Sequence, residues 1–338
     1  MGDVVMASPM IRGLRRAHPN AHIAWLAEPH LKGLLRAQRD LDAVVCWPKA
    51  RWKMLVRRGR FLRLGREIGA FCRGMRRQRF DLALDAQGLL RSRFLAWLSG
   101  ATRRVGFDSS EPGKFLMTRI VARGADSRHM GSEYYHLMET LGMDARGLAP
   151  SVAFDPKARR SAEKKLAAAG VGPGYVVICP FTTRPQKHWV EGNWVALCRS
   201  INRKWGVPVV ILGGPSDGDS ARKIGRSAGT SAFEFAGKTT LEESAAVVGG
   251  AAMVIGVDTG LTHMGTAFRR PTIALFGATR PYLTTESHRT CVLYDGLPCS
   301  PCKRKPTCRG AFSCMAGLSV ERVLGRAEAL WALEDEST

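Results

Sequence analysis

The stretch AAMVIGVDTGLTHMGTAF, residues 251–268, predicts a strand that turns directly into a helix. Residues 251–257 are apolar or small, as in a buried strand, and apolar side chains recur at helical spacing after Gly260. Between these runs, Asp258 and Thr259 place polar groups at a tight turn. A helix that starts there directs free backbone N–H groups and the positive end of its dipole at one point, which suits a phosphate. An ordinary turn in which Asp258 caps the helix fits the same residues.

A second strand and loop of the same kind lie upstream. Residues 175–179 are an apolar run, and the loop that follows carries hydroxyl and basic side chains, namely Thr182, Thr183, Arg184, Lys187 and His188. In open α/β sheets, ligands bind at the carboxyl ends of the strands. We therefore expect the two loops to border one crevice and to hold one phosphorylated ligand.

These residues resemble the donor site of a known family, the ADP-heptose:lipopolysaccharide heptosyltransferases (glycosyltransferase family 9). The motifs are TTxxxKHW at residues 182–189 and DTGLxH at residues 258–263. Two more stretches are similar to family motifs: the opening MGDVV with Pro9, and residues 84–108. The four motifs occur in the family's order, and the resemblance covers nearly the whole chain.

The resemblance implies the GT-B architecture, an α/β fold of two doubly wound Rossmann-like domains that face each other across a cleft. The expected domains are residues 1–150, which bind the acceptor, and residues 157–318, which bind the nucleotide-sugar donor, followed by a C-terminal helix over residues 319–338. The family pattern has a strand before the Met-Gly-Asp loop, and none precedes it here. The first strand is therefore expected either to lie upstream of Met1 or to be missing.

Segments with the pattern of a strand alternate with segments with the pattern of a helix along both halves of the chain. This alternation also predicts parallel, doubly wound sheets. Apolar runs predict strands over residues 21–26, 43–47, 82–84, 175–179, 207–212, 251–257 and 272–276. Helical spacing predicts helices over residues 4–17, 31–37, 60–78, 88–98, 133–142, 158–169, 194–204, 220–227, 241–248 and 319–333.

Length and composition agree with two globular domains. The 338 residues suffice for two cores, and 45% of them are hydrophobic, which is typical of a globular protein. The chain has no run of about 18 apolar residues that would predict a transmembrane helix. Asp3, Pro9 and Arg12 interrupt any apolar core of a signal peptide, so we expect a cytoplasmic protein.

Much of the net charge of +22 lies in one stretch. Residues 49–79 contain twelve Lys or Arg and one acid, Glu67. The apolar residues within this stretch recur every three to four positions, which predicts an amphipathic helix over residues 60–78 with a basic outer face. Such a face attracts nucleic acid, anionic lipid headgroups or a phosphorylated glycolipid. The alternative is an arginine-rich surface with no specific partner.

The resemblance implies an inverting transfer of heptose from ADP-heptose to the lipopolysaccharide inner core. A single displacement needs a base for the acceptor hydroxyl, stabilisation of the leaving diphosphate, and alignment. Asp3 is the candidate base; it could also, or instead, cap a helix over residues 4–17. Lys187 is the candidate that stabilises the charge developing on ADP, and with this cation and a helix dipole no metal is required for catalysis.

The donor-binding residues that the resemblance implies are Thr182, Thr183, Lys187, Asp217, Asp258, Thr259, Gly260, Leu261 and His263. The threonines would donate to the phosphates, and Asp217, or else Asp219, would bind the ribose. Asp258 would hold heptose hydroxyls or only cap its helix. His263 would contact the diphosphate or the sugar, or be a satisfied core histidine. His188 and Trp189 are expected to support the loop.

On the acceptor side we expect Gln87 and Arg91, together with Arg57, Arg58, Arg60 and Arg63, to meet phosphates of the lipid A–core acceptor. The expected partners are ADP-heptose, this acceptor and the surface of the inner membrane at its cytoplasmic face, with no nucleic acid. Two alternatives stay open: a family member that uses another nucleotide-sugar, and a non-catalytic basic protein that binds RNA or anionic lipid. ADP binding that survives high salt would separate the enzyme from the latter.

Four of the nine cysteines form a cluster in sequence. Their spacing is C-x2-C-x5-C-x5-C, and four thiolates so spaced could hold a structural Zn²⁺. The cysteines are Cys299, Cys302, Cys308 and Cys314. Disulfides are disfavoured in a reducing cytoplasm, whereas free thiols or an iron–sulfur cluster remain as alternatives.

Overall fold

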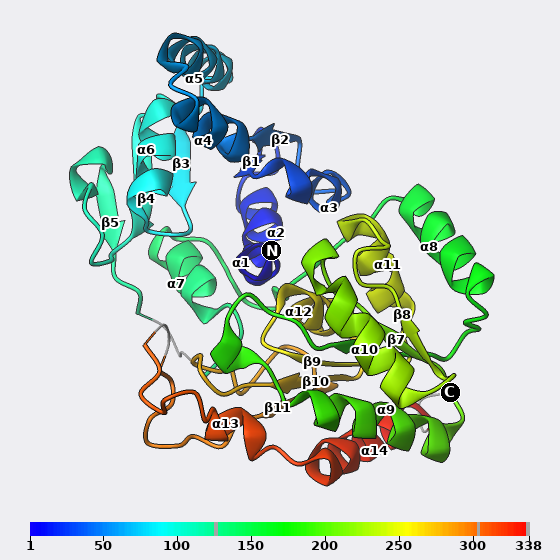
Figure 1. The fold of residues 1–338 in the computed structure, drawn as a ribbon. Helices are drawn as coiled ribbons and strands as arrows, with labels where there is room; N and C mark the ends of the chain where they lie inside the picture. Colours follow the sequence, from blue (N-terminus) through cyan, green and yellow to red (C-terminus); the bar gives the residue numbers. More distant parts are fainter. Residues whose placement is uncertain (125–127, 303–304, 336–338) are drawn as a thin grey trace. The chain divides into compact units, whose positions relative to one another are not determined.

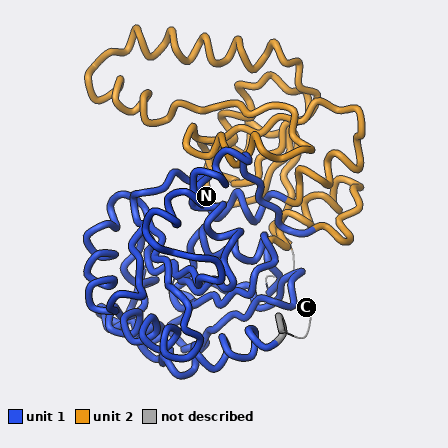
Figure 2. Tube along the Cα trace, turned by 90° about the vertical axis from the view of Figure 1, so that its right-hand side faces the viewer, with its two compact units in different colours: residues 1–8, 127–130, 149–338 blue, residues 9–126, 131–148 orange. Residues whose placement is uncertain are grey.

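The computed structural model describes residues 1–124, 128–302 and 305–335 (Figure 1). The chain divides into two compact units (Figure 2). Unit 1 comprises residues 1–8, 127–130 and 149–338, and unit 2 comprises residues 9–126 and 131–148. The last boundary lies at the start of the proline-containing stretch 148–156. Residues 1–8 group with the C-terminal half, which differs from the expected extent of the first domain.

Unit 1 is built on a six-stranded parallel sheet with the order β11-β10-β9-β6-β7-β8. The strands are β6 (Val176–Cys179), β7 (Val209–Ile211), β8 (Ala232–Glu234), β9 (Met253–Val257), β10 (Thr272–Leu275) and β11 (Thr290–Leu293). β7 and β8 follow β6 on one side of the sheet, whereas β9, β10 and β11 lie in turn on the other side of β6. The order therefore reverses between β6 and β9, and this switch point is where such sheets bind ligands.

Helices cover both faces of this sheet (Figure 1), which explains why its central strands are wholly apolar. One layer holds α9 (Glu191–Trp205), α10 (Gly218–Ala228) and α14 (Val320–Asp335), and the other holds α8 (Pro156–Ala168), α11 (Leu241–Gly250) and α12 (Gly260–Ala267). Trp194, Leu197 and Ile201 of α9 are fully buried in the core beneath the sheet. The remaining elements of unit 1 are α1 (Gly2–Ala7), η3 (Pro185–Lys187), η4 (Pro215–Asp217) and α13 (Ser313–Ala316).

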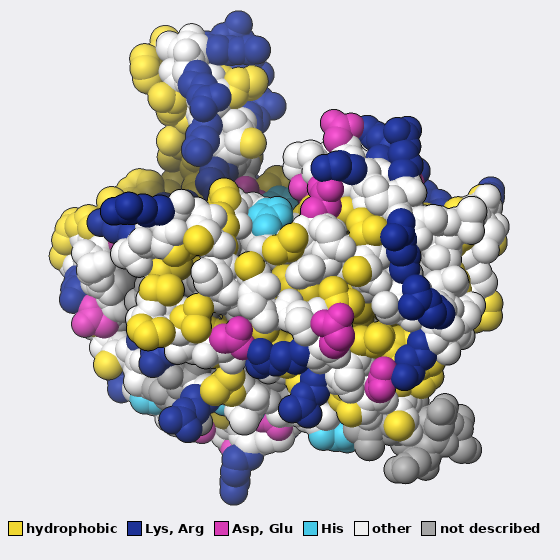
Figure 3. Space-filling view, turned by 60° about the horizontal axis from the view of Figure 1, so that its bottom comes forward, with side chains coloured by type: hydrophobic (Ala, Val, Ile, Leu, Met, Phe, Trp, Pro, Cys, Tyr) yellow, Lys and Arg dark blue, Asp and Glu magenta, His cyan; other side chains and the backbone are white. Residues whose placement is uncertain are grey.

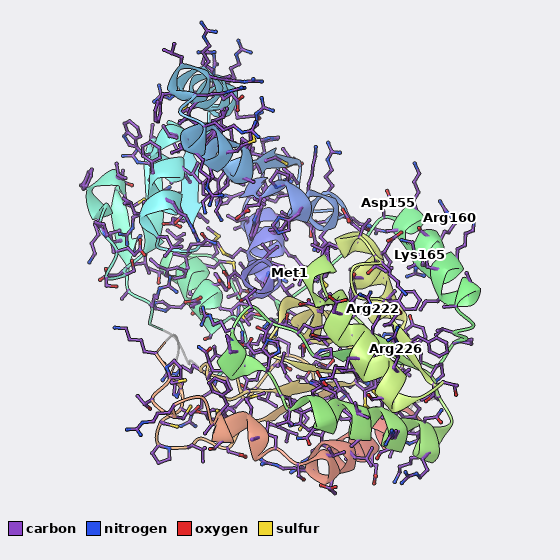
Figure 4. All side chains as sticks on the ribbon, in the orientation of Figure 1. Met1, Asp155, Arg160, Lys165, Arg222 and Arg226 are labelled. Carbon is purple, nitrogen blue, oxygen red and sulfur yellow. The ribbon has the colours of Figure 1, made fainter. Side chains whose placement is uncertain are left out.

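Polar contacts also join these helices. The Lys165 ammonium on α8 lies 2.6 Å from a carboxylate oxygen of Glu243 on α11, so the two neighbours are joined by an ion pair (Figure 4). Ser319 caps α14 by accepting a hydrogen bond from the N–H of Arg322 at 3.2 Å.

Unit 2 contains two parallel sheets, β1-β2 and β3-β4-β5. The strands are β1 (Ala24–Ala27), β2 (Ala43–Cys46), β3 (Leu82–Asp85), β4 (Arg103–Phe107) and β5 (Arg119–Val121). The helices are α2 (Pro9–Ala17), η1 (Pro29–Leu31), α3 (Lys32–Arg36), α4 (Lys49–Arg57), α5 (Phe61–Arg76), α6 (Leu90–Leu98), η2 (Lys114–Leu116) and α7 (Ser132–Thr140). Within the described residues, no helix is long and apolar enough to cross a membrane.

The helix expected over residues 4–17 is two helices. α1 ends at Ala7 and α2 begins at Pro9, because proline has no N–H to continue the ladder but suits the first position of a new helix. Ser8 lies at the break, where its hydroxyl donates to the carbonyl of Val5 at 2.7 Å and accepts from the N–H of Ser151 at 2.8 Å. The single-helix prediction was wrong for this reason.

Candidate active site

The switch point of unit 1 brings the two predicted loops together. Cys179 at the end of β6 pairs with Gly256 near the end of β9, so the loops that follow start side by side. A Cβ on Gly256 would lie 2.1 Å from the Thr262 hydroxyl oxygen and 2.7 Å from the Cβ of Cys179, so no larger residue fits. The Thr262 hydroxyl donates to the carbonyl of Val257 at 2.8 Å and thereby joins the start of α12 to the end of β9.

Hydrogen bonds from two side chains, His188 and Trp189, fix the loop after β6. The Nε2 of His188 lies 2.9 Å from the carbonyl oxygen of Thr182, to which it donates. Trp189 is 3% exposed and donates from its indole N–H to the carbonyl of Leu318 at 2.8 Å. Both contacts support the loop, as the sequence predicts for these residues. The short helix η3 then directs Lys187 toward the neighbouring turn.

Asp258 lies at the centre of the site. One of its oxygens, Oδ2, lies 2.7 Å from the ammonium of Lys187 and accepts a hydrogen bond from the hydroxyl of Thr279 at 2.5 Å. The other, Oδ1, lies 3.1 Å from Nε2 of His263. Burial by itself would raise the pKa of Asp258, but the hydrogen bond and charge of His263 and the charge of Lys187 together hold this pKa well below its ordinary value.

The structure therefore brings Lys187 and Asp258 together from two different strands. It also corrects the expectation that Asp258 caps α12. The N-cap residue is Thr259, whose side chain makes no capping hydrogen bond, and the Asp258 carboxylate instead receives Lys187, His263 and Thr279.

His263 is 2% exposed, and both of its ring nitrogens have partners. Nδ1 lies 2.9 Å from the hydroxyl of Tyr282, while Nε2 faces Asp258. Burial and the charge of Asp258 raise the pKa of Tyr282, so this hydroxyl keeps its proton. The Tyr282 hydroxyl at Nδ1 and the Asp258 carboxylate at Nε2 thus give each ring nitrogen a hydrogen-bond partner. This is the arrangement of the satisfied core histidine.

Thr279 and Tyr282 were missed by the sequence reasoning. Both follow β10, whose carboxyl end lies next to that of β9. The available signal was the position of these hydroxyl-bearing residues just after a predicted strand, at the same edge of the sheet as the two recognised loops.

The N-terminal residues pack against the start of α12 within unit 1. A Cβ on Gly260 would lie 2.5 Å from Cε of Met1 and 3.0 Å from the N of Gly2, and a Cβ on Gly2 would lie 3.2 Å from Cδ2 of His263. Asp3 is exposed in the first turn of α1, and the N-cap of that helix is Met1. The expected capping role of Asp3 was therefore wrong, although an acid in the first turn still favours the helix dipole. Figure 4 labels Met1 at this position.

The candidate ribose ligand follows β7, the strand next to β6. Asp217 is partly exposed, and its Oδ2 accepts the N–H of Gly214 at 2.8 Å, which closes the turn. The alternative, Asp219, forms an ion pair with Arg222 and its side chain is 94% exposed. Thr182 and Thr183 stay accessible on the neighbouring loop.

The predicted acceptor residues all lie in unit 2. Gln87 and Arg91 follow the carboxyl end of β3, where the N–H of Gln87 donates to Asp85 at 2.9 Å. The arginines of the other group surround the turn between α4 and α5 (Arg57, Arg58, Arg60 and Arg63). Among the described residues, no hydrogen bond or ion pair joins the two groups.

The cysteine cluster lies near the end of β10. A Cβ on Gly277 would lie 2.8 Å from the sulfur of Cys314, and the sulfur of Cys302 lies 4.0 Å from the carbonyl oxygen of Ala278. Burial and the nearby thiols of Cys299, Cys302 and Cys308 raise the pKa of Cys314. In the described part of the chain, however, no three His, Cys, Asp or Glu side chains are placed to hold a metal ion.

Comparison with known proteins places this geometry in a family. The family model described as glycosyltransferase family 9 (heptosyltransferase) matches residues 68–311. Lipopolysaccharide heptosyltransferase 1 of Pseudomonas aeruginosa is 30% identical over 91% of this chain and 84% of its own length. The enzyme of the same name from Salmonella typhimurium is 28% identical over 84% of this chain and 87% of its own length.

Solved structures show the same fold. A family 9 glycosyl transferase from Veillonella parvula superposes with a TM-score of 0.83 at 21% identity, over 98% of this chain and 94% of its own. ADP-heptose lps heptosyltransferase II of E. coli gives a TM-score of 0.76 at 20% identity, over 99% and 96% of the two chains. Both units are thus Rossmann-like α/β folds of the GT-B class, and the sequence matches extend across most of the chain. The protein belongs to glycosyltransferase family 9, the heptosyltransferases.

Proposed function

We propose that this glycosyltransferase transfers a heptose from ADP-heptose to the lipopolysaccharide inner core, with inversion at the anomeric carbon. The observation that carries the proposal is that the Lys187 ammonium lies 2.7 Å from Asp258, just before the start of α12, at the switch point of unit 1. Relatives that cover most of the chain and are named lipopolysaccharide heptosyltransferases support the choice of sugar and acceptor.

The donor diphosphate would lie between the two loops. The Lys187 ammonium, the first amides of α12 and the hydroxyls of Thr182, Thr183 and Thr259 would surround it. Negative charge moves onto ADP as the glycosidic bond breaks, and these fixed positive groups would stabilise that charge where it develops. In this proposal they replace a metal ion in catalysis.

Asp258 would serve both the cation and the sugar. A carboxylate offers about four lone-pair sites, and Lys187, His263 and Thr279 occupy three. The fourth would accept a heptose hydroxyl, while the first three hold Lys187 in place. Buried His263 would act by orienting Asp258 rather than by contacting the substrate.

Asp3 would be the general base. Its helix starts beside Gly260, so this exposed carboxylate belongs to the same unit as the donor loops. It would take the proton of the acceptor hydroxyl late in the displacement, when that proton has become acidic. Asp217, which still has one oxygen without a partner among the described residues, would bind the ribose.

The acceptor would be the lipid A–core glycolipid. Gln87, Arg91 and the arginines of the α4–α5 turn, including Arg57 and Arg63, would contact its phosphates. Because that glycolipid is a membrane component, the enzyme would act as a peripheral protein at the cytoplasmic face of the inner membrane.

A structural zinc ion is a separate proposal. Cys302 and Cys314 already lie beside consecutive residues at the end of β10, and the loop between them contains Pro306. Binding would draw the four sulfurs to about 2.3 Å from the metal and would stabilise this loop locally.

The function is tested by incubating the enzyme with ADP-heptose and an acceptor that lacks the inner-core heptose. Mass spectrometry should show addition of one heptose, and ADP-glucose or UDP-sugars should react far more slowly. Preferred use of another nucleotide-sugar would overturn the choice of donor. Loss of ADP binding at high salt would overturn the assignment of a specific donor site.

A further inference from the structure

The turn between α4 and α5 exposes large apolar side chains. Leu62 is 86% exposed, Phe61 64%, Val56 50% and Met54 39%. They lie within nine residues of one another, on the last turn of α4 and the first turn of α5. Contact of such side chains with water is unfavourable, so four of them at one turn indicate a binding surface.

Arginines surround these apolar side chains. Arg51 and Arg63 share Glu67, at 2.6 and 3.5 Å. Four further arginines have no ion pair within the described residues, namely Arg57, Arg58, Arg60 and Arg66. On the one face that Figure 3 draws, Lys and Arg side chains lie among hydrophobic ones. The turn therefore combines exposed hydrophobic groups with uncompensated positive charge.

We propose that the α4–α5 turn, residues 54–66, is a membrane-docking surface whose partner is a bilayer of anionic phospholipid. The phosphates of a sugar or of a nucleic acid would explain the arginines but would leave Leu62 and Val56 in water. A bilayer interface satisfies both groups, since apolar side chains enter the acyl region while guanidinium groups remain among the phosphates.

This inference builds on the proposed function, because an acceptor held in a membrane requires the enzyme to reach that membrane. Vesicle binding measures docking without catalysis, so the two proposals can fail separately. A heptosyltransferase that does not bind vesicles would overturn only the docking surface, and a vesicle-binding protein without transferase activity would overturn only the proposed function.

The test uses the full chain and sedimentation with vesicles of phosphatidylcholine, with or without phosphatidylglycerol, at about 0.1 M salt. We expect strong binding only to the anionic vesicles. The double variant Phe61→Ser with Leu62→Ser should bind at least about tenfold more weakly, because the two apolar side chains that would enter the acyl region are lost. Arg58→Glu with Arg60→Glu should also lose binding, and more so as salt is raised.

Matched controls separate this surface from general charge and hydrophobicity. Arg160→Glu with Arg226→Glu changes the net charge equally on α8 and α10 of unit 1 and should leave vesicle binding nearly unchanged (Figure 4). Phe115→Ser removes a phenylalanine of unit 2 that is 85% exposed and lies on η2, and it should also bind normally.

Unchanged melting temperature and ADP affinity would show that each variant is folded. Vesicle binding by the Phe61 and Leu62 variant equal to that of the wild type would overturn the proposal. So would a loss of binding to a single-stranded RNA, but not to vesicles, in the Arg58 and Arg60 variant, because the turn would then be a nucleic-acid surface.

Discussion

Replacing Asp258 with asparagine would separate the charge of this residue from its shape. The change keeps the volume and one oxygen acceptor but leaves the Lys187 ammonium, whose side chain is 15% exposed, without its carboxylate partner. It also replaces the acceptor that faces Nε2 of His263 at 3.1 Å. We expect the folded protein to become less stable and to lose most of its transferase activity.

The magnitude follows from the burial of the pair. Breaking a buried ion pair on one side costs about 3–5 kcal/mol, and partial access of water to Lys187 lowers the expectation to about 2–3 kcal/mol. Asp258 has a folded-state pKa below its unfolded value, so its stabilisation is complete above about pH 5. It is lost as the pH falls through the lowered pKa. The difference between wild type and variant should therefore be constant near neutrality and shrink in acid.

Urea unfolding at several pH values, followed by circular dichroism, measures this difference. Asp219→Asn is the matched control, because Asp219 also forms an ion pair, with Arg222, but its side chain is 94% exposed. That variant should unfold almost as the wild type does. A loss below about 0.5 kcal/mol for Asp258→Asn, or a loss that does not diminish in acid, would refute the role given to burial and to Lys187.

Three other substitutions test the site, and a metal analysis tests the cysteine cluster. Asp3→Asn should lower turnover by about two orders of magnitude or more with nearly unchanged ADP affinity, and wild-type turnover would remove Asp3 from the mechanism. Lys187→Gln should lower turnover by about a hundredfold or more and weaken ADP binding in calorimetry, because the leaving diphosphate loses its cation. Tyr282→Phe should destabilise the protein by about 1–3 kcal/mol in urea, since it leaves Nδ1 of His263 unpaired. Elemental analysis should find about one zinc per chain, and chelation should lower the melting temperature while ADP still binds; a metal-free protein of equal stability contradicts the zinc site.

The sheet of unit 1 was largely predictable because a parallel sheet with helices on both faces needs continuous apolar strands. The predicted runs at residues 175–179, 251–257 and 272–276 are β6, β9 and β10. The two edge strands, β8 and β11, were missed. They are only three and four residues long and are partly exposed, so their sequence pattern is weak.

Unit 2 was predicted less completely. α4 was missed because only Leu55 of its nine residues is buried, which leaves little helical periodicity to read. β4 and β5 were missed because arginines begin both strands and interrupt the apolar pattern. The amphipathic helix expected over residues 60–78 is α5, Phe61–Arg76.

In the site, local sequence predicted the loops but not their connections. Lys187 and Asp258 follow strands that are far apart in sequence, and their side chains lie 2.7 Å apart. Because both loops carry residues that suit a phosphate, the sequence predicted that the loops would lie together, but it did not predict this ion pair. The contacts of Thr279 and Tyr282 depend on how the chain returns after β10, which no local pattern specifies. The catalytic and ligand-binding roles of these residues stay predictions.

The packing of α1 on α12 has a consequence for the order of folding. Gly2 packs close to His263 in the folded protein. The residues of α1 are synthesised roughly 260 residues before the residues of α12 that they contact. Contacts of such long sequence separation form late, because a large loop must first be closed. The segment that carries Asp3 would therefore wait, unpaired, until the sheet of unit 1 is assembled. A chaperone that binds nascent chains would find this apolar segment accessible until the residues around His263 have been synthesised.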